Sequence, residues 1–267
     1  MRIRELLIVS SAFILLAVSC RKTPEQPETK NGKISFNFKH RVDGQPLQVD
    51  TMMYINAAGN HYLVNEIQYF ISDVTLHKSN GDSVLLDNWE DIHYVDSDIP
   101  STWTYALQDD VKPGIYDAIS FTFGINEQKN QSLMFVNPPE SLMFWPELLG
   151  GGYHYMKLNG KWLDTLDHIT PFNFHLGIGQ IYYSFPDSIS RYVQNYFKVS
   201  LPNSGFEMKP GETKNFTLVM NVENWFQNPN VFDFNYWGGD IMQKQDAMHA
   251  ACQNGWDVFT IEANGKK

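Results

Sequence analysis

The chain has 267 residues, of which 14% are aromatic, and its 30 acidic side chains outnumber 20 basic ones to give a formal net charge of −10. So many large rings can bury a sizeable core, which excludes a disordered chain, and the acidity argues against nucleic acid as a partner because that affinity comes from clustered cations. With two cysteines and no CxxC pair, the sequence also excludes a disulfide framework, a four-cysteine zinc site and c-type haem attachment.

The first 20 residues have the pattern of a bacterial export signal. Arg2 and Arg4 precede a short apolar run over residues 6–18, and small residues then lead to Cys20. This ending resembles a lipobox, in which the cysteine becomes the lipid-modified first residue of the mature protein. The alternative is a secretory signal or a short anchor without lipid. We expect a signal peptide over residues 1–19 and lipidation at Cys20.

Composition divides the rest of the chain into a tether and a domain. Residues 20–32 contain two prolines, many charges and no large apolar side chain, which is typical of a flexible tether. Residues 33–267 contain no internal repeat and no second composition regime, so we expect one domain there. The expected location is the cell envelope, with the lipid inserted in a bacterial membrane, either in the periplasm or at the outer surface.

Short apolar-patterned runs alternate with Gly, Pro, Asn and Asp at the spacing typical of a β-sandwich. The expected strands are residues 34–38, 62–77, 83–86, 115–123, 153–158, 172–176, 192–201 and 213–222. One amphipathic helix is expected over 239–253, with Gly255 ending it, and residues 187–195 fit either a short helix or a strand. The pattern predicts an all-β fold: an antiparallel, Greek-key-like β-sandwich with long loops and a short C-terminal helix.

The motifs of common enzyme classes are missing from the sequence. It has no GxSxG, no phosphate-binding P-loop, no GxGxxG opening a helix and no HExxH. A pair of carboxylates for glycoside hydrolysis stays open, because only their separation in space identifies such a pair. We expect that the protein is not an enzyme.

Residues 141–160, SLMFWPELLGGGYHYMKLNG, place a tryptophan and a histidine on either side of three glycines. If residues 153–158 form a strand, His154 shares a face with Met156 and Leu158, which is the better candidate for the buried side. A buried imidazole needs a hydrogen-bond acceptor or a metal as partner. His154 is therefore a candidate metal ligand.

Two further histidines are candidate ligands. His175 alternates with Phe174 and Leu176, so it points away from their apolar layer. His40 follows Phe38 in register and belongs to the core-facing set or to the rim beyond it. For all three candidates, a structural histidine held by hydrogen bonds is the alternative.

Several segments, taken together and in this order, resemble the MbnP-like copper-binding domain family in its Bacteroidota-type lipoprotein form. They are FNFKHRVDGQPLQVD (36–50), YINAAGNHYLVNEIQYFISDVTLHKSNGD (54–82), PGIYDAISFTFGIN (113–126), MFWPELLGGGYHYMKLNGKW (143–162) and FNFHLG (172–177). With the strands between and after them, they cover residues 33–222. Each segment alone is a weak signal, whereas the combination is specific.

The resemblance implies an exported β-sandwich that binds copper and is often encoded beside a dihaem cytochrome c peroxidase-like partner. In relatives, that partner oxidises a tryptophan to kynurenine, which helps histidines to hold the copper. On this chain the Met-x-Trp segment makes Trp145 the residue expected to be modified, and Phe-His-Leu-Gly supports His175 as a ligand. Imidazole suits copper and binds it only when neutral, so copper affinity should fall as the pH drops through the histidine range.

A different class of function also fits the sequence. A surface lipoprotein with a β-sandwich could bind glycan or peptide, and tryptophans in its long loops would stack on sugar rings. The tryptophans in such loops are Trp89, Trp103, Trp225 and Trp237. Retention of copper by the purified protein separates this alternative from the metal-binding hypothesis.

Overall fold

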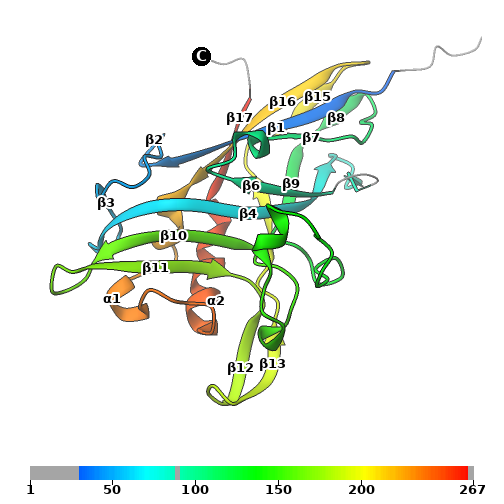
Figure 1. The fold of residues 1–267 in the computed structure, drawn as a ribbon. Coiled ribbons are helices and arrows are strands. Elements are labelled where there is room, and N and C mark those ends of the chain that lie inside the picture. The colour runs from blue at the N-terminus through cyan, green and yellow to red at the C-terminus, as the bar shows by residue number, and fades with distance from the viewer. Residues whose placement is uncertain (1–29, 88–90, 264–267) are drawn as a thin grey trace, which may run out of the picture.

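A computed structural model describes residues 30–87 and 91–263 as two packed sheets with two small strand pairs and a few short helices (Figure 1). The expected signal peptide, Cys20 and Trp89 lie outside these residues. Across the two described stretches, we find no helix that is long and apolar enough to cross a membrane.

The larger sheet is built around one long strand, β4 (His61–His77), which is rich in β-branched and aromatic residues. The sheet runs in the order β11 (Ile169–Leu176), β10 (Met156–Leu163), β4, β9 (Ala118–Phe123) and β14 (Phe197–Leu201). Three short strands also pair with β4, namely β3 (Tyr54–Ile55), β5 (Ser83–Leu85) and β6 (Ile92–Asp96). All these pairs are antiparallel, and β10 and β11 form one end of the sheet.

The smaller sheet joins the first and last strands of the fold. Its order is β17 (Phe259–Ala263), β16 (Thr213–Asn221), β1 (Lys33–Val42) and β2 (Gln45–Pro46), and β7 (Thr104–Ala106) also pairs with β1. The β1–β16 pair is parallel, from Lys33 opposite Thr213 to Arg41 opposite Asn221, whereas the other pairs of this sheet are antiparallel.

The remaining elements decorate these two sheets. Two small pairs form from β12 (Gly179–Ser184) with β13 (Ser188–Val193) and from β8 (Gly114–Tyr116) with β15 (Phe206–Met208). The helices are η1 (Pro100–Trp103), η2 (Glu140–Met143), η3 (Glu147–Leu149), η4 (Val222–Phe226), α1 (Phe234–Trp237), α2 (Gln245–Asn254) and η5 (Gly255–Asp257).

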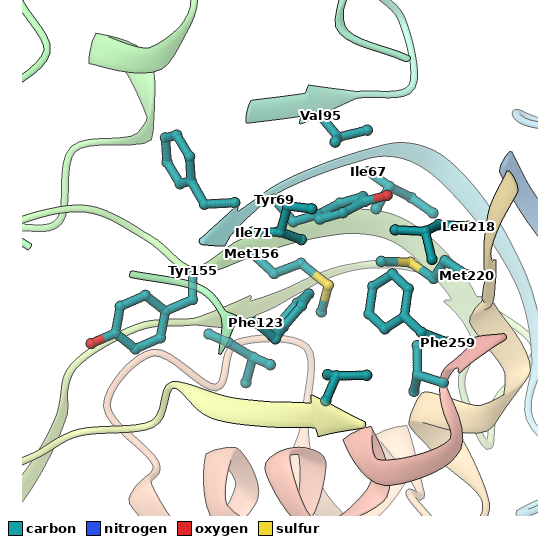
Figure 2. Packing of buried hydrophobic residues seen from close by; sticks show 14 of the residues in the cluster. Ile67, Tyr69, Ile71, Val95, Phe123, Tyr155, Met156, Leu218, Met220 and Phe259 are labelled. Atoms are coloured by element: carbon teal, nitrogen blue, oxygen red, sulfur yellow. The ribbon is translucent and has the colours of Figure 1, made fainter. Parts of the chain in front are cut away.

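Aromatic side chains fill the space between the sheets. Figure 2 shows Tyr69 of β4, Phe123 of β9 and Phe259 of β17 in one cluster, with ring centroids 6.0 Å apart for Tyr69 and Phe123 and 5.7 Å apart for Phe123 and Phe259. All three rings are at most 1% exposed. Burying one such side chain contributes about 1.5–3 kcal/mol, so this cluster is a main source of the stability of the sandwich.

The all-β sandwich fold predicted from the sequence is confirmed, with local differences. The expected strand over 115–123 is divided into β8 and β9, and the one over 192–201 into β13 and β14. Residues 187–195, left open between helix and strand, contain β13. Regular pairing in the expected strand over 153–158 starts only at Met156.

The late helix α2 begins six residues after the start expected from the sequence and ends, as expected, at Gly255. The segment before it packs instead along the edge of the larger sheet. Asn173 of β11 donates its backbone N–H to the Gly239 carbonyl (2.7 Å) and its side-chain amide to Asp240 (2.6 Å). These tertiary bonds take up backbone that the local pattern assigned to the helix.

Candidate metal centre

A loop folds back over the outer face of β10 and β11, and it brings Trp145 and His154 together. We call residues 140–153 the cover loop. The backbone N–H of Trp145 donates to the Gly152 carbonyl (2.8 Å), and the backbone N–H of His154 donates to the Met143 carbonyl (2.7 Å). The return of the chain passes through Gly150, Gly151 and Gly152, whose φ values of 123°, 71° and 76° favour glycine.

The ring of His154 is held in one tautomer. Its Nδ1 lies 2.9 Å from the Met143 carbonyl oxygen, which can only accept, so Nδ1 carries the proton and donates it. Nε2 is then left with a lone pair, and it is buried without a hydrogen-bond partner among the residues that the structure describes. The side chain as a whole is only 5% exposed.

His175 is fixed in the opposite tautomer by a chain of polar side chains. Asn159 of β10 donates its amide N–H to Glu66 of β4 (2.6 Å), which turns its Oδ1 towards Nε2 of His175 at 2.7 Å. Nε2 therefore donates, and Nδ1 keeps the lone pair. Within the described stretches, this Nδ1 is also buried and lacks a hydrogen-bond partner.

The two imidazoles meet at right angles beneath the cover loop. Their ring centroids are 5.1 Å apart, with an interplanar angle of 84°. Since His154 contacts His175, which lies on the outer face, it too lies on that face, on the other side of the sheet from Met156 and Leu158. The expectation that His154 is buried is confirmed, but the cover loop buries it and the core between the sheets does not.

Trp145 completes this cluster. Its indole is fully buried, with its ring centroid 4.6 Å from that of His154, and its Nε1 donates to the Leu149 carbonyl (3.1 Å). The ring lies against Gly177, just after β11, where a Cβ atom would be 2.5 Å from the indole. The glycine of the Phe-His-Leu-Gly segment is therefore the residue that makes room for Trp145.

Both histidines are neutral in the pH range where proteins usually work. Burial, together with the nearby charges of His175 and Lys157, lowers the pKa of His154 from 6.5 to about 3. Burial and Lys157 lower the pKa of His175 to about 4, and Asp240 opposes this shift. Neutral rings are the form in which imidazole binds a metal.

The third candidate ligand, His40, is not brought into this cluster. It lies on β1 of the smaller sheet, with its ring edge-on to Tyr69 of β4 at 5.8 Å, on the inner side of the sandwich. Burial lowers the pKa of His40 to about 4, and its Nε2 is buried with no partner in the described part of the chain. Among residues 30–87 and 91–263, no group of three or more His, Cys, Asp or Glu could hold a metal ion, so His40 cannot join His154 and His175.

The loop tryptophans that suggested glycan binding do not form one surface. Trp225 is fully buried in the core, and its ring lies 5.1 Å from that of Phe123. Trp103 is 39% exposed, Trp237 is half-buried, and Trp89 is not among the described residues. Trp225 therefore has no exposed face on which a sugar ring could stack.

Three groups that orient the centre were not found from the sequence. They are the Met143 carbonyl, the Asn159 side chain and Lys157, which lies opposite His175 in the β10–β11 pair. Asn159 and Lys157 alternate with Met156 and Leu158, so the strand pattern places them on one face with His175 and could have drawn attention to them. The role of the carbonyl depends on a tertiary fold-back that no local pattern reveals.

Comparison with known proteins agrees with this fold. The family model described as MbnP matches residues 31–243. The structure is similar to that of MbnP from Methylosinus trichosporium, with a TM-score of 0.57 and 13% sequence identity over 88% of this chain and 100% of that chain. No curated protein matches the sequence. Because the family model spans most of the chain, the chain belongs to the MbnP family.

Proposed function

We propose that this chain is an exported, lipid-anchored copper-binding protein of the cell envelope, without catalytic activity of its own. The observation that carries the proposal is the convergence of His154 and His175, two neutral imidazoles each with a buried ring nitrogen that meets no hydrogen-bond partner within the described residues. Membership of the MbnP family supports copper as the metal. The lipobox-like ending at Cys20 supports the anchor.

The donor set fits copper. Imidazole suits both Cu(I) and Cu(II), and copper stands at the top of the affinity series for nitrogen ligands among divalent first-row metals. Nε2 of His154 and Nδ1 of His175 would hold the ion, while Met143 and Asn159 fix the orientation of the rings from behind, as second-shell partners do in metal sites. Bound copper would serve as a one-electron redox centre or as cargo.

Trp145 is the residue we propose as the target of a dihaem cytochrome c peroxidase-like partner, which would oxidise it to kynurenine with peroxide as the oxidant. Two oxygen atoms would be added as the indole C2–C3 bond is cleaved, and hydrolysis would release the C2 carbon as formate. Its indole packs against His154, so the product would lie beside the two imidazoles. The described residues provide no third His, Cys, Asp or Glu at this place. A modified Trp145 is therefore the side chain best placed to complete the coordination.

Titration of Cu(I) into the purified protein tests the site. The variants His154→Ala and His175→Ala should each weaken binding strongly, whereas His40→Ala, which alters a buried histidine of the other sheet, should leave it unchanged. Copper binding that survives in the double variant His154→Ala/His175→Ala would refute this assignment.

Mass analysis of tryptic peptides tests the modification. After co-production with the dihaem partner, the peptide that contains Trp145 should carry the mass of kynurenine, and the peptide with the equally buried Trp225 should not. Modification of Trp225 and not Trp145 would contradict the proposal. An unmodified Trp145 in protein in which the partner has oxidised some other residue would contradict it too.

A further inference from the structure

One charged side chain acts on both histidines of the candidate centre. Lys157 lies directly opposite His175 in the β10–β11 pair and opposite Gln68 in the β10–β4 pair. Residues directly opposite each other have Cβ atoms about 5 Å apart on the same face of the sheet. The Lys157 ammonium also donates to the Leu142 carbonyl of the cover loop (2.6 Å). It is thus held between the sheet and the loop that encloses the centre.

The charge of Lys157 acts on both imidazoles of the centre, whereas that of Asp240 acts on His175. Lys157 is half-buried, and its charge lowers the pKa of both His154 and His175. Asp240 acts on His175 in the opposite direction, and Glu66 is already bonded to Asn159. Burial lowers the pKa of Lys157 and Glu66 raises it.

We propose that Lys157 sets the oxidation-state preference of the centre, by placing a positive charge where it disfavours Cu(II) relative to Cu(I). The inference rests on the proposed copper site at His154 and His175. A divalent ion carries one more unit of charge than a monovalent ion in the same place, so a nearby ammonium repels it more. At a separation of about 6 Å and an effective dielectric constant near 40, between the values for a protein surface site and for bulk water, this difference corresponds to about a tenfold change in relative affinity.

Lys157 also has a structural role that must be separated from its charge. Its bond to Leu142 holds the cover loop next to Met143, whose carbonyl orients His154. Loss of that bond would weaken the binding of monovalent and divalent ions alike. The charge changes the ratio of the two affinities, and the ratio is therefore the quantity to measure.

The test compares Lys157→Met with Lys157→Arg and with a matched control, Lys161→Met. Lys161 is an exposed lysine on the same face of the same strand, four residues further from the centre. Ag⁺ and Zn²⁺ serve as redox-inert probes, and the reduction potential of bound copper is measured in parallel. For Lys157→Met the Zn²⁺/Ag⁺ affinity ratio should rise about tenfold and the copper potential should fall by about 59 mV. Lys157→Arg and Lys161→Met should keep the wild-type ratio and potential.

The outcomes separate this inference from the function on which it rests. If the wild-type protein binds neither probe nor copper, the proposed copper site is wrong, and this inference falls with it. If the wild type binds them and Lys157→Met keeps the same ratio and potential, or loses affinity for both probes equally, only the role of Lys157 is refuted. Lys157→Gln provides a second neutral variant should the methionine variant not fold.

Discussion

Acidification should destabilise the metal-free protein through His154. The pKa of this residue is about 3 in the folded protein, with burial as the largest cause, whereas an imidazole in an unfolded chain has a pKa of about 6.5. Between these two values the unfolded state binds one more proton than the native state. The free energy of unfolding that His154 contributes is therefore complete above pH 6.5 and is lost as the pH falls towards 3.

The size of this loss follows from the pH interval over which the unfolded state binds the extra proton. One proton changes the free energy of unfolding by about 1.36 kcal/mol per pH unit, so a drop from pH 8 to pH 5 should cost about 2 kcal/mol from His154 alone. Urea unfolding of the metal-free wild type and of His154→Gln at several pH values measures it. The stability difference between them should shift by about 2 kcal/mol from pH 8 to pH 5, in favour of the variant at low pH.

The glutamine variant keeps a side-chain N–H for the Met143 carbonyl but has no proton to take up in this range. His61→Gln serves as control for the loss of a histidine as such, because His61 is exposed and lies outside the centre. A constant difference for His154→Gln over the same range would refute the assignment of a buried, neutral imidazole at this position.

Three further predictions concern the surroundings of the two histidines. Gly177→Ala should destabilise the protein by about 1–3 kcal/mol in urea unfolding, because its Cβ would overlap the indole of Trp145, and an unchanged midpoint would contradict the close contact. Asn159→Leu should leave Nε2 of His175 without its acceptor, which should weaken copper binding about 10- to 100-fold in a Cu(I) titration; wild-type affinity would count against this orienting role. Copper affinity should be constant from pH 8 to pH 5, since the pKa values of His154 and His175 are about 3 and 4, and a decline that begins near pH 6.5 would show that the rings are not buried as described.

Local patterns in the sequence were sufficient to predict the sandwich and part of the centre. Alternation placed His175 on the face opposite Phe174 and Leu176, and in the structure those two side chains are buried while His175 faces Lys157 and Asn159. The same alternation put His40 in the core-facing set of β1 or at the rim beyond it, and in the structure its ring packs against Tyr69 on the inner side. Period-two patterning therefore gives the face of a strand that carries each side chain.

Patterning gives neither the partner of a strand nor the path of a loop, and the remaining features depend on these. The parallel β1–β16 pair joins Lys33 to Thr213, and nothing in either local sequence encodes that contact. His154 was expected beside Met156, but the backbone before β10 bonds to the cover loop, and the ring lies on the outer face. His40 and His154 consequently lie on opposite sides of the larger sheet. Local patterning alone could not separate them, because it made both histidines candidates for the buried side of their strands.

The double use of the Met143 carbonyl has a consequence for kinetics. This single oxygen accepts both the backbone N–H of His154 (2.7 Å) and its ring Nδ1–H (2.9 Å). Lifting the cover loop would break both bonds at once and release the ring from its orientation. An ion held there would enter and leave at the rate at which the loop opens, so that residence time and equilibrium affinity become separate properties of the protein. Changes that loosen the loop would then accelerate both entry and exit of the ion, and they would weaken binding only as far as they release the ring of His154 from its orientation.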